Sequence, residues 1–323
     1  MARLRLAIAA VLLLVSPNAF AADFSETSIT LAVPPGALAG TLALPSTGAP
    51  TAAVLLIAGS GPTNRDGNST IPGVQPNTLK LLAQELAARG FATLRTDKRG
   101  IGESAAAMTS EADLTIQTYS GDNRAWATDL RHKAGVPCVW LLGHSEGALI
   151  AELAAKDNPD ICGLILIAGA GRSMGTIIRA QVEGNPANPP EIRKQVFDIL
   201  ASLEAGHTVV DVPPMLQSLF RPSVQPYLMS ELALDPAAIL SRLRIPVQIL
   251  QGDNDLQVSI ADAQALAAAR PDAKLAILAG VNHVLKIAPP DRAANFATYA
   301  DPALPVAPGI VDLIASFMGL HRP

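Results

Sequence analysis

One stretch of the sequence decides the fold: Trp140-Leu141-Leu142-Gly143-His144-Ser145-Glu146-Gly147-Ala148. The apolar residues that lead into it, over 136–142, predict a buried strand, and the alanine-rich residues that follow predict a helix over 146–156. Gly143 and Gly147 flank Ser145 in the G-x-S-x-G pattern of a strained strand-to-helix turn. Such a turn needs neighbours without a Cβ, because the strand and the helix approach closely. The stretch therefore predicts an exposed, nucleophilic serine, and the alternative is an ordinary turn with an incidental serine.

The composition favours one large α/β domain and gives no support to several other classes of protein. The chain has 323 residues, 49% of them hydrophobic, which is enough for a full core. A formal net charge of −4 gives no electrostatic support for binding nucleic acid. No His and Cys residues have zinc spacing, and Asp253-Asn254-Asp255 lacks the rest of a calcium-binding EF-hand loop. We therefore expect no metal and no cofactor.

The loop at residues 97–104 contains glycines and basic residues that invite comparison with phosphate-binding loops. It has neither the Walker spacing nor the dinucleotide-binding G-x-G-x-x-G pattern. We interpret it as a structural loop in which Arg99 pairs with a nearby acid.

The N-terminus has the pattern of a secretory signal peptide. Arg3 and Arg5 precede an apolar run over 6–15, and Ala19-Phe20-Ala21 supplies a cleavage site of the A-x-A type. We expect cleavage after Ala21 and export of the mature protein to the periplasm or the medium. No later stretch is apolar over about 18 residues, so no stable membrane insertion is expected.

The two cysteines, Cys138 and Cys162, each stand at the start of a predicted strand. If these strands are parallel neighbours, both cysteines lie at the same end of the sheet, away from its carboxyl edge. An oxidising compartment permits a disulfide between them, whereas two buried free thiols would pack as small apolar residues. Because disulfide geometry is narrow, the sequence leaves both states open.

Predicted strands and helices alternate along most of the chain, which is typical of a mostly parallel sheet with helices on both faces. The predicted strands are 27–33 and 37–44, which form a hairpin, 52–58, 91–96, 136–142, 162–168, 245–251 and 274–278. The predicted helices are 78–89, 119–133, 146–156, 259–269 and 308–318. Between residues 171 and 243 the alternation stops, and helical segments broken by prolines predict an insertion. We therefore divide the chain into a signal peptide (1–21), a core (22–170 and 244–323) and a helical cap (171–243).

A serine hydroxyl becomes a good nucleophile only when a base takes its proton and an acid orients that base. The sequence supplies candidates in the order Ser145, Asp255, His283, each at the end of a predicted strand, where α/β sheets place their sites. Asp253 competes with Asp255, but it is closer to its strand and suits a turn residue.

Five histidines compete for the role of the base. His283 has the expected position after the last strand. The side chain of His144, next to the serine, is expected to diverge from it. The remaining three are interpreted as surface or packing residues: His132, His207 and His321.

The oxyanion of the reaction needs two N–H donors. The N–H of Glu146 at the start of the helix is one candidate, and the N–H of Ser60 in Gly59-Ser60-Gly61 is the second. The alternative for the latter segment is a plain glycine-rich turn. The Glu146 carboxylate is not expected to be catalytic, since a negative charge is favourable at a helix start.

The motifs together resemble the α/β-hydrolase superfamily, in particular its serine esterase and serine-aminopeptidase-like branch. The resemblance covers nearly all of the mature chain and rests on five motifs in the family's order: 56–62, Asp97-x-Arg99-Gly100-x-Gly102-x-Ser104, Gly143-x-Ser145-x-Gly147, Gly252-x-x-Asp255 and Asn282-His283. In this family the aspartate of G-x-x-D is the acid of the triad, which favours Asp255. In one position the sequence departs from the family pattern: Ala58 replaces the histidine that the family usually has before the first loop glycine. The resemblance also implies that residues 171–243 form the variable cap that determines substrate choice.

We expect an exported carboxylic-ester hydrolase that acts on a small-molecule or polymeric ester; some exported esterases of similar pattern act on polyesters. A peptidase or amidase would use the same triad and would need an acid in the cap to hold the substrate's amino group. Four cap acids are available for this: Glu183, Glu191, Glu204 and Asp211. A third hypothesis is a non-catalytic binding module with the α/β-hydrolase fold, although chains of that kind usually lack the serine or the histidine of the triad. Dehalogenase chemistry is disfavoured because it needs a carboxylate at position 145. The oligomeric state is left open.

Overall fold

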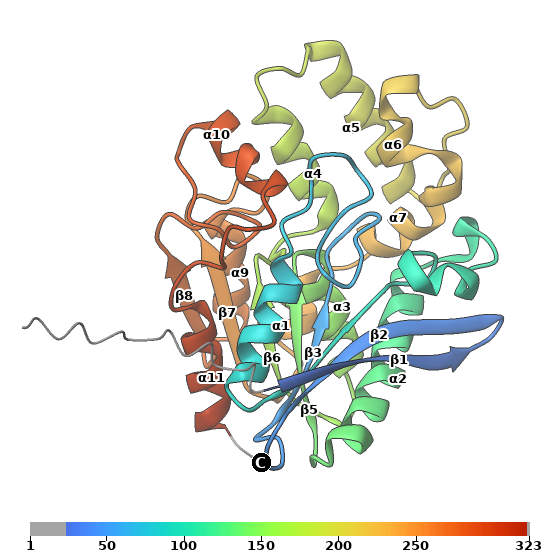
Figure 1. The fold of residues 1–323 in the computed structure, drawn as a ribbon. Coiled ribbons are helices and arrows are strands. Elements are labelled where there is room, and N and C mark those ends of the chain that lie inside the picture. The colour runs from blue at the N-terminus through green and yellow to red at the C-terminus, as the bar shows by residue number, and fades with distance from the viewer. Residues whose placement is uncertain (1–23, 322–323) are drawn as a thin grey trace, which may run out of the picture.

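The computed structural model describes residues 24–321, so the predicted signal peptide, residues 1–21, lies outside the described residues. Within residues 24–321, the centre is an eight-stranded sheet in the order β1-β2-β4-β3-β5-β6-β7-β8. β2 runs antiparallel to both of its neighbours, and the other strand pairs are parallel (Figure 1). The strands are β1 (Phe24–Val33), β2 (Gly36–Pro45), β3 (Ala53–Ile57), β4 (Ala92–Thr96), β5 (Val139–His144), β6 (Ile161–Ile167), β7 (Val247–Gly252) and β8 (Lys274–Leu278). The prediction of a mostly parallel sheet is confirmed.

Helices cover both faces of this sheet. They are α1 (Thr78–Ala88), α2 (Ile116–Ala134), α3 (Glu146–Ala155), α9 (Ile260–Ala269) and α11 (Ile310–Leu320). Alternate residues of a strand point to opposite faces. In β3, Leu55 and Ile57 share a core cluster with α2 and α3, whereas Val54 and Leu56 share one with α1 and α11. Because both faces are buried, the central strands consist of continuous apolar runs.

Residues 168–246 connect β6 to β7 and are largely helical. Their helices are α4 (Met174–Glu183), α5 (Pro190–Glu204), α6 (Gln217–Phe220), α7 (Gln225–Leu232) and α8 (Pro236–Leu240). We call α4 to α7 the cap helices; in Figure 1, α5 and α6 lie near the top, and α4 and α7 lie below them. Most of their apolar side chains, among them Ile178, Phe220 and Leu228, pack on one another in a small separate core. α8 packs against α3 and α9 instead. Within residues 24–321, no helix is both long enough and apolar enough to span a membrane.

Several element boundaries differ from the sequence-based expectation, and one helix was not predicted. β1 begins at Phe24 rather than at residue 27, and α2 begins at Ile116 rather than at residue 119. β5 begins at Val139 rather than at residue 136. Pro137 has no N–H to give to a strand ladder, which explains the later start. α10 (Arg292–Ala297), in the segment between β8 and α11, was not predicted. It is only six residues long, which is too short to show helical periodicity.

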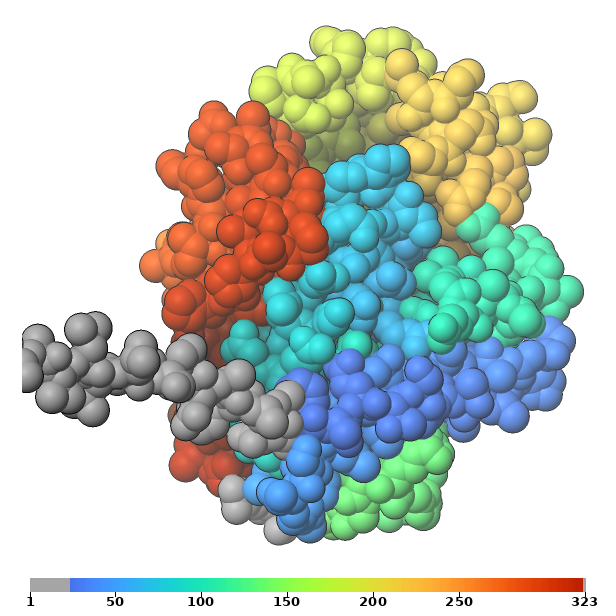
Figure 2. All heavy atoms as spheres, in the orientation of Figure 1, coloured from blue at the N-terminus to red at the C-terminus, as the bar shows by residue number. Residues whose placement is uncertain are grey.

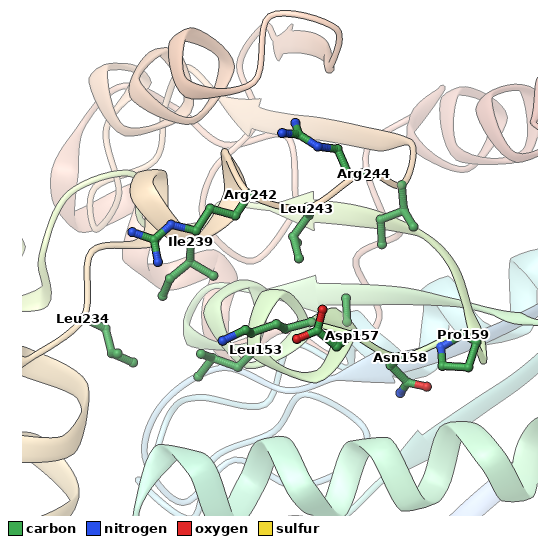
Figure 3. A pocket seen from close by; sticks show the side chains of 12 residues that line it. Leu153, Asp157, Asn158, Pro159, Leu234, Ile239, Arg242, Leu243 and Arg244 are labelled. Atoms are coloured by element: carbon green, nitrogen blue, oxygen red, sulfur yellow. The ribbon is translucent and has the colours of Figure 1, made fainter.

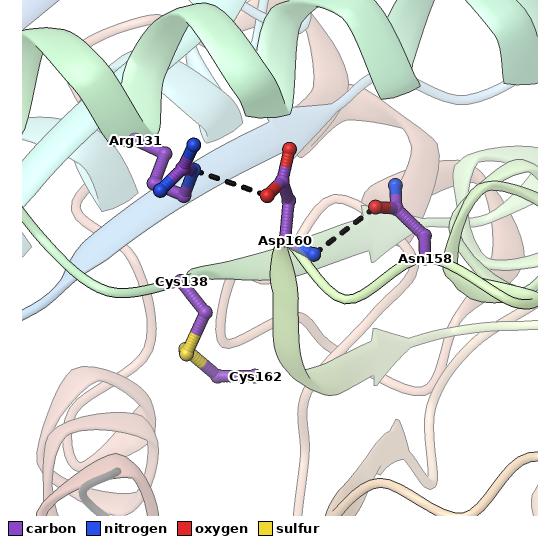
Figure 4. Close-up of a disulfide and its surroundings, with 5 residues drawn as sticks. All are labelled: Arg131, Cys138, Asn158, Asp160 and Cys162. Atoms are coloured by element: carbon purple, nitrogen blue, oxygen red, sulfur yellow. Dashed lines mark hydrogen bonds and ion pairs between the residues drawn. A yellow bond between two sulfur atoms is a disulfide. The ribbon is translucent and has the colours of Figure 1, made fainter.

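Cys138 and Cys162 form a disulfide, one of the two states that the sequence left open. Cys138 immediately precedes β5 and Cys162 is the second residue of β6, so the bond joins neighbouring parallel strands near their amino ends (Figure 4). Close by, Arg131 of α2 pairs with Asp160, with 3.0 Å between Nε and Oδ1. The disulfide therefore lies at the opposite edge of the sheet from Ser145, and we expect it to affect stability rather than chemistry.

Removal of this disulfide is expected to lower the free energy of unfolding. The two cysteines are 24 residues apart in sequence, and a crosslink over a loop of that length is worth about 3 kcal/mol. For a domain of this size, that loss lowers the melting temperature by roughly 5 °C. The comparison is between the wild type and Cys138→Ser/Cys162→Ser, each with and without dithiothreitol. The reductant should lower the melting temperature of the wild type alone, and equal melting temperatures without reductant would contradict the prediction.

Candidate active site

Ser145 occupies the turn between β5 and α3 in a strained conformation. Its φ is 58° and its ψ is −124°, a region that residues other than glycine rarely adopt. A Cβ on Gly143 would lie 2.2 Å from the carbonyl oxygen of Gly147, and a Cβ on Gly147 would lie 2.3 Å from that of Ile57. The close approach of β3, β5 and α3 therefore requires both glycines of the G-x-S-x-G pattern.

His283 and Asp255 form a hydrogen-bonded pair at the carboxyl ends of β8 and β7. The distance from His283 Nδ1 to Asp255 Oδ2 is 2.8 Å. An ionised carboxylate only accepts hydrogen bonds, so Nδ1 carries the proton and Nε2 is left as the basic atom. Within residues 24–321, Ser145 Oγ has no hydrogen bond to His283. Contacts of this kind are often long in the free enzyme and tighten when the substrate binds.

The Asp255 carboxylate is held in its ionised form. Burial on its own would raise the pKa of this group, but the electrostatic interaction with His283 and the hydrogen bonds outweigh burial and lower the pKa below its usual value. Oδ1 accepts from the N–H groups of Gln257 and Val258 at 2.7 and 3.0 Å. Oδ2 accepts from Gln251 Nε2 at 3.2 Å in addition to His283. The side chain can thus hold the imidazole in one orientation and one tautomer.

Asp253, the competing candidate for the acid of the triad, contacts the backbone of another loop rather than His283. Its Oδ1 accepts a hydrogen bond of 2.7 Å from the N–H of Gly280. Asp253 therefore joins the loop after β7 to the loop after β8, and Asp255 is the aspartate that contacts His283. The sequence suggested a turn role for Asp253, but its partner lies in another loop rather than in its own turn.

His144 packs against His283, which the sequence did not anticipate. The two ring centroids are 4.9 Å apart, and His144 Nε2 lies 2.7 Å from the backbone carbonyl oxygen of His283. Burial lowers the pKa of His144 to about 4, so the ring is neutral at pH 7 and its Nε2–H donates to that carbonyl. His144 thus supports the loop that carries the candidate base. His132, His207 and His321 are not part of this group; His321 Nδ1, for example, contacts the carbonyl oxygen of Phe317.

The two predicted oxyanion donors lie next to Ser145. Glu146 is the first residue of α3. A Cβ on Gly59 would lie 3.0 Å from Ser145 Cβ and 3.6 Å from Ser145 Oγ, so the chain before Ser60 passes directly over the serine. Among the described residues, neither the Ser60 N–H nor the Glu146 N–H has a hydrogen-bond acceptor. Both are therefore available to a developing oxyanion.

The loop at residues 97–104 is structural around Arg99, as expected. The Arg99 guanidinium makes two hydrogen bonds to the Asp122 carboxylate, at 2.9 and 2.6 Å. The neighbouring Lys98 was missed, because a lysine in a loop is ordinarily a solvated side chain. It is only 8% exposed here, and its Nζ contacts the backbone of residues 59–61, which we call the oxyanion loop.

Three segments that are far apart in sequence meet around the site. In Figure 2 the loop after β3 lies between the cap helices and the segment that contains α10. The N–H of Gln75 in this loop donates to the carbonyl oxygen of Tyr299 at 2.8 Å. Gln181 of α4 donates to the carbonyl oxygen of Gln257 at 2.8 Å. These contacts join the cap and the α10 segment to the loops that carry Ser60 and Asp255.

A cavity of about 630 Å³ lies elsewhere, between the end of α3 and the chain that leads into β7 (Figure 3). Its walls include Leu153, Leu243 and Arg244. The lining residues just before β6 and β7 place the cavity near the amino ends of these strands. Ligands of open α/β sheets bind outside the carboxyl ends, and none of the predicted site residues lines this cavity. It is therefore separate from the candidate active site.

The chain matches a family model and a curated relative. The family model described as serine aminopeptidase, S33, matches residues 77–201, which include Ser145. Esterase EstD of Thermotoga maritima is 28% identical over 274 residues, which cover 81% of this chain and 60% of EstD. The chain thus spans about 60% of the length of this relative.

Solved structures share the fold at low sequence identity. A proline iminopeptidase-related protein from Thermus thermophilus has a TM-score of 0.60 and 20% identity, covering 93% of this chain and 99% of that chain. A thermophilic esterase from Thermogutta terrifontis has a TM-score of 0.55 and 18% identity, covering 93% of this chain and 100% of that chain. The chain therefore has the α/β-hydrolase fold, and its sequence is similar to the serine aminopeptidase family and to an esterase.

Proposed function

We propose that this chain is an exported serine hydrolase that cleaves carboxylic esters, either small molecules or polymers. The observation that carries the proposal is the Asp255–His283 pair, 2.8 Å apart, in which His283 packs against His144, the residue before the strained Ser145. The match to a relative named as an esterase supports ester cleavage.

Ser145 and His283 can transfer the acyl group in two steps, acylation of the serine and hydrolysis of the acyl-enzyme. Ser145 Oγ forms a bond to the acyl carbon while His283 Nε2 takes the hydroxyl proton. The Ser60 and Glu146 N–H groups stabilise the resulting oxyanion, an effect worth roughly 3 kcal/mol per donor. The ester C–O bond then breaks, and His283 gives its proton to the departing alcohol. In the second half, His283 takes a proton from water, which attacks the acyl-enzyme, and the acid leaves as the proton returns to Ser145.

A peptidase or amidase is the second candidate, because the matching family model is described as a serine aminopeptidase. An aminopeptidase needs a cap acid that can hold the substrate's ammonium group. The four acids that the sequence offered are all solvent-exposed: Glu183, Glu191, Glu204 and Asp211. Glu204 is also paired with Arg179 at 2.7 Å. The buried cap acid is Glu231, which faces Lys98 and Glu146. Because the first four acids are exposed and Glu231 already faces the Lys98 ammonium, these placements support an ester substrate rather than an aminopeptidase substrate.

The test is a substrate series on residues 22–323. We expect turnover of p-nitrophenyl esters from acetate to palmitate, with a chain-length optimum that reports the size of the acyl site. Aminoacyl p-nitroanilides should give a lower kcat/KM. Turnover of the anilides alone would replace the ester proposal by the peptidase one, and no turnover of either class would contradict both.

Export rests on the signal-peptide pattern and is supported by the disulfide, since disulfides persist mainly in oxidising compartments. Expression of the full chain should therefore yield a periplasmic or secreted protein whose N-terminal residue is Ala22. Mass spectrometry measures this directly, and an uncleaved chain confined to the cytoplasm would contradict export.

A further inference from the structure

The side chain of Lys98 is buried beneath the oxyanion loop, residues 59–61. Its Nζ donates hydrogen bonds to the carbonyl oxygens of Gly59 and Gly61, at 2.6 and 2.8 Å. The same Nζ lies 3.7 Å from Glu146 Oε2. One ammonium group thus contacts both chain segments that carry the predicted oxyanion donors. Charge-assisted hydrogen bonds of this kind are stronger than those between neutral groups.

Peptide geometry connects these contacts to the Ser60 N–H. The Gly59 carbonyl and the Ser60 N–H belong to one planar trans peptide unit, so the two groups point in opposite directions. When Lys98 fixes the direction of the carbonyl, it also fixes the direction of the N–H. The Gly61 carbonyl holds the other side of Ser60 in the same way, and Thr63 Oγ1 donates to the Ser60 carbonyl oxygen at 2.8 Å.

We propose that Lys98 is a positioning residue that holds the peptide between Gly59 and Ser60 in the orientation in which the Ser60 N–H stabilises the oxyanion. The inference rests on the proposed function, because it assigns Lys98 a task in that reaction. Lys98 acts through the backbone of the loop. Among the described residues, its hydrogen bonds go to backbone carbonyls and none goes to Ser145 or His283, so it is not a second base.

The surroundings of Lys98 keep its charge balanced. Glu146 of α3 and Glu231 of α7 both face it, and the ring centroid of Tyr119 lies 5.5 Å from Nζ. Burial lowers the pKa of Lys98, and the two carboxylates oppose that change. Burial and the charge of Glu146 raise the pKa of Glu231 well above its usual value. Glu146 Oε2 is 3.7 Å from Lys98 Nζ, and through Glu231 a cap helix contributes to the same cluster.

The test compares the wild type with Lys98→Met, which keeps most of the side-chain volume but has no donor. Loss of one oxyanion donor typically lowers kcat by about 10²-fold or more, so we expect a fall of that order with a change in KM of less than about threefold. The matched control is Arg99→Met, which removes the neighbouring cation of the same loop. Arg99 binds Asp122 and not the oxyanion loop, so this variant should be less stable but should keep its kcat within about threefold of the wild type. Rates are referred to the concentration of folded protein, obtained from circular dichroism.

A second readout separates positioning from a merely structural role. An alkylboronic acid forms a tetrahedral adduct with a nucleophilic serine, and one of its oxygens occupies the oxyanion site. Its Kd, measured by calorimetry, should rise in Lys98→Met by about the factor by which kcat/KM falls, and it should be unchanged in Arg99→Met. An unchanged boronic-acid Kd in Lys98→Met, or a kcat within threefold of the wild type, would overturn the inference and leave the proposed function standing. A wild type without turnover of any ester would overturn the proposed function, and the boronic-acid comparison would still decide the role of Lys98.

Discussion

Replacement of Ser145 by alanine is expected to lower kcat for a p-nitrophenyl ester by about 10⁶-fold. The proposed reaction has no other group in position to form the acyl-enzyme. What activity remains should come from the oxyanion donors and from substrate binding alone. Alanine keeps the Cβ of Ser145, and among the described residues the hydroxyl makes no hydrogen bond that the change would remove. We therefore expect an unchanged melting temperature and a nearly unchanged KM.

The measurement is steady-state hydrolysis of the best ester of the series by the variant and the wild type. Ser218→Ala is the matched control, because Ser218 is an exposed serine on α6, outside the candidate site. It should keep the full activity of the wild type. If Ser145→Ala retained more than about 1% of the wild-type kcat, Ser145 would not be the nucleophile.

Replacement of Asp255 by asparagine is expected to lower kcat by about 10⁴-fold. The carboxylate accepts the Nδ1–H of His283, whereas an amide nitrogen at the same place would donate to Nδ1. The imidazole proton would then sit on Nε2, the atom that must take the proton of Ser145. The side chain would also lose the negative charge that stabilises the imidazolium. The fold should survive, since the amide oxygen can still accept from the N–H groups of Gln257 and Val258.

Asp253→Asn is the matched control for this variant. Asp253 lies two residues away in the same loop, and its Oδ1 accepts from the N–H of Gly280. An amide oxygen can replace that acceptor, so kcat should stay within about threefold of the wild type. Both variants are assayed on the same ester across a range of pH. A large loss in Asp253→Asn together with a small one in Asp255→Asn would reverse the assignment of the acid.

Apolar runs and helical periodicity in the sequence were sufficient to predict a mostly parallel sheet covered by helices on both faces. The apolar runs of β3, β5, β6 and β7 predicted strands buried on both faces, because such strands need hydrophobic side chains in every position. The errors were confined to boundaries and short elements, such as the start of β5 and the six residues of α10. The ends of helices and strands depend on which backbone N–H and C=O groups form hydrogen bonds, and the periodicity of apolar residues does not show these hydrogen bonds.

In the cap helices, the sequence pattern did not predict which acidic side chains are buried. Its acids appeared equivalent in the sequence, yet Glu204 pairs with Arg179 at the surface, while Glu231 is 2% exposed and lies among charged groups of the body. Glu231 was not among the acids predicted to matter. Burial of an ionisable group changes its pKa and its role, and burial is set by the packing of distant segments.

By itself, the sequence determined the order of strands and helices and the prediction of Ser145 and His283 as nucleophile and base. Each of these follows from residues that are close together along the chain. Only the tertiary structure decided that Asp255 rather than Asp253 contacts His283, that Cys138 and Cys162 are bonded, and that Lys98 lies beneath the oxyanion loop. The physical reason is that hydrogen bonds and disulfides act over a few ångströms in space, whereas Lys98 and its partner Gly59 are 39 residues apart in sequence.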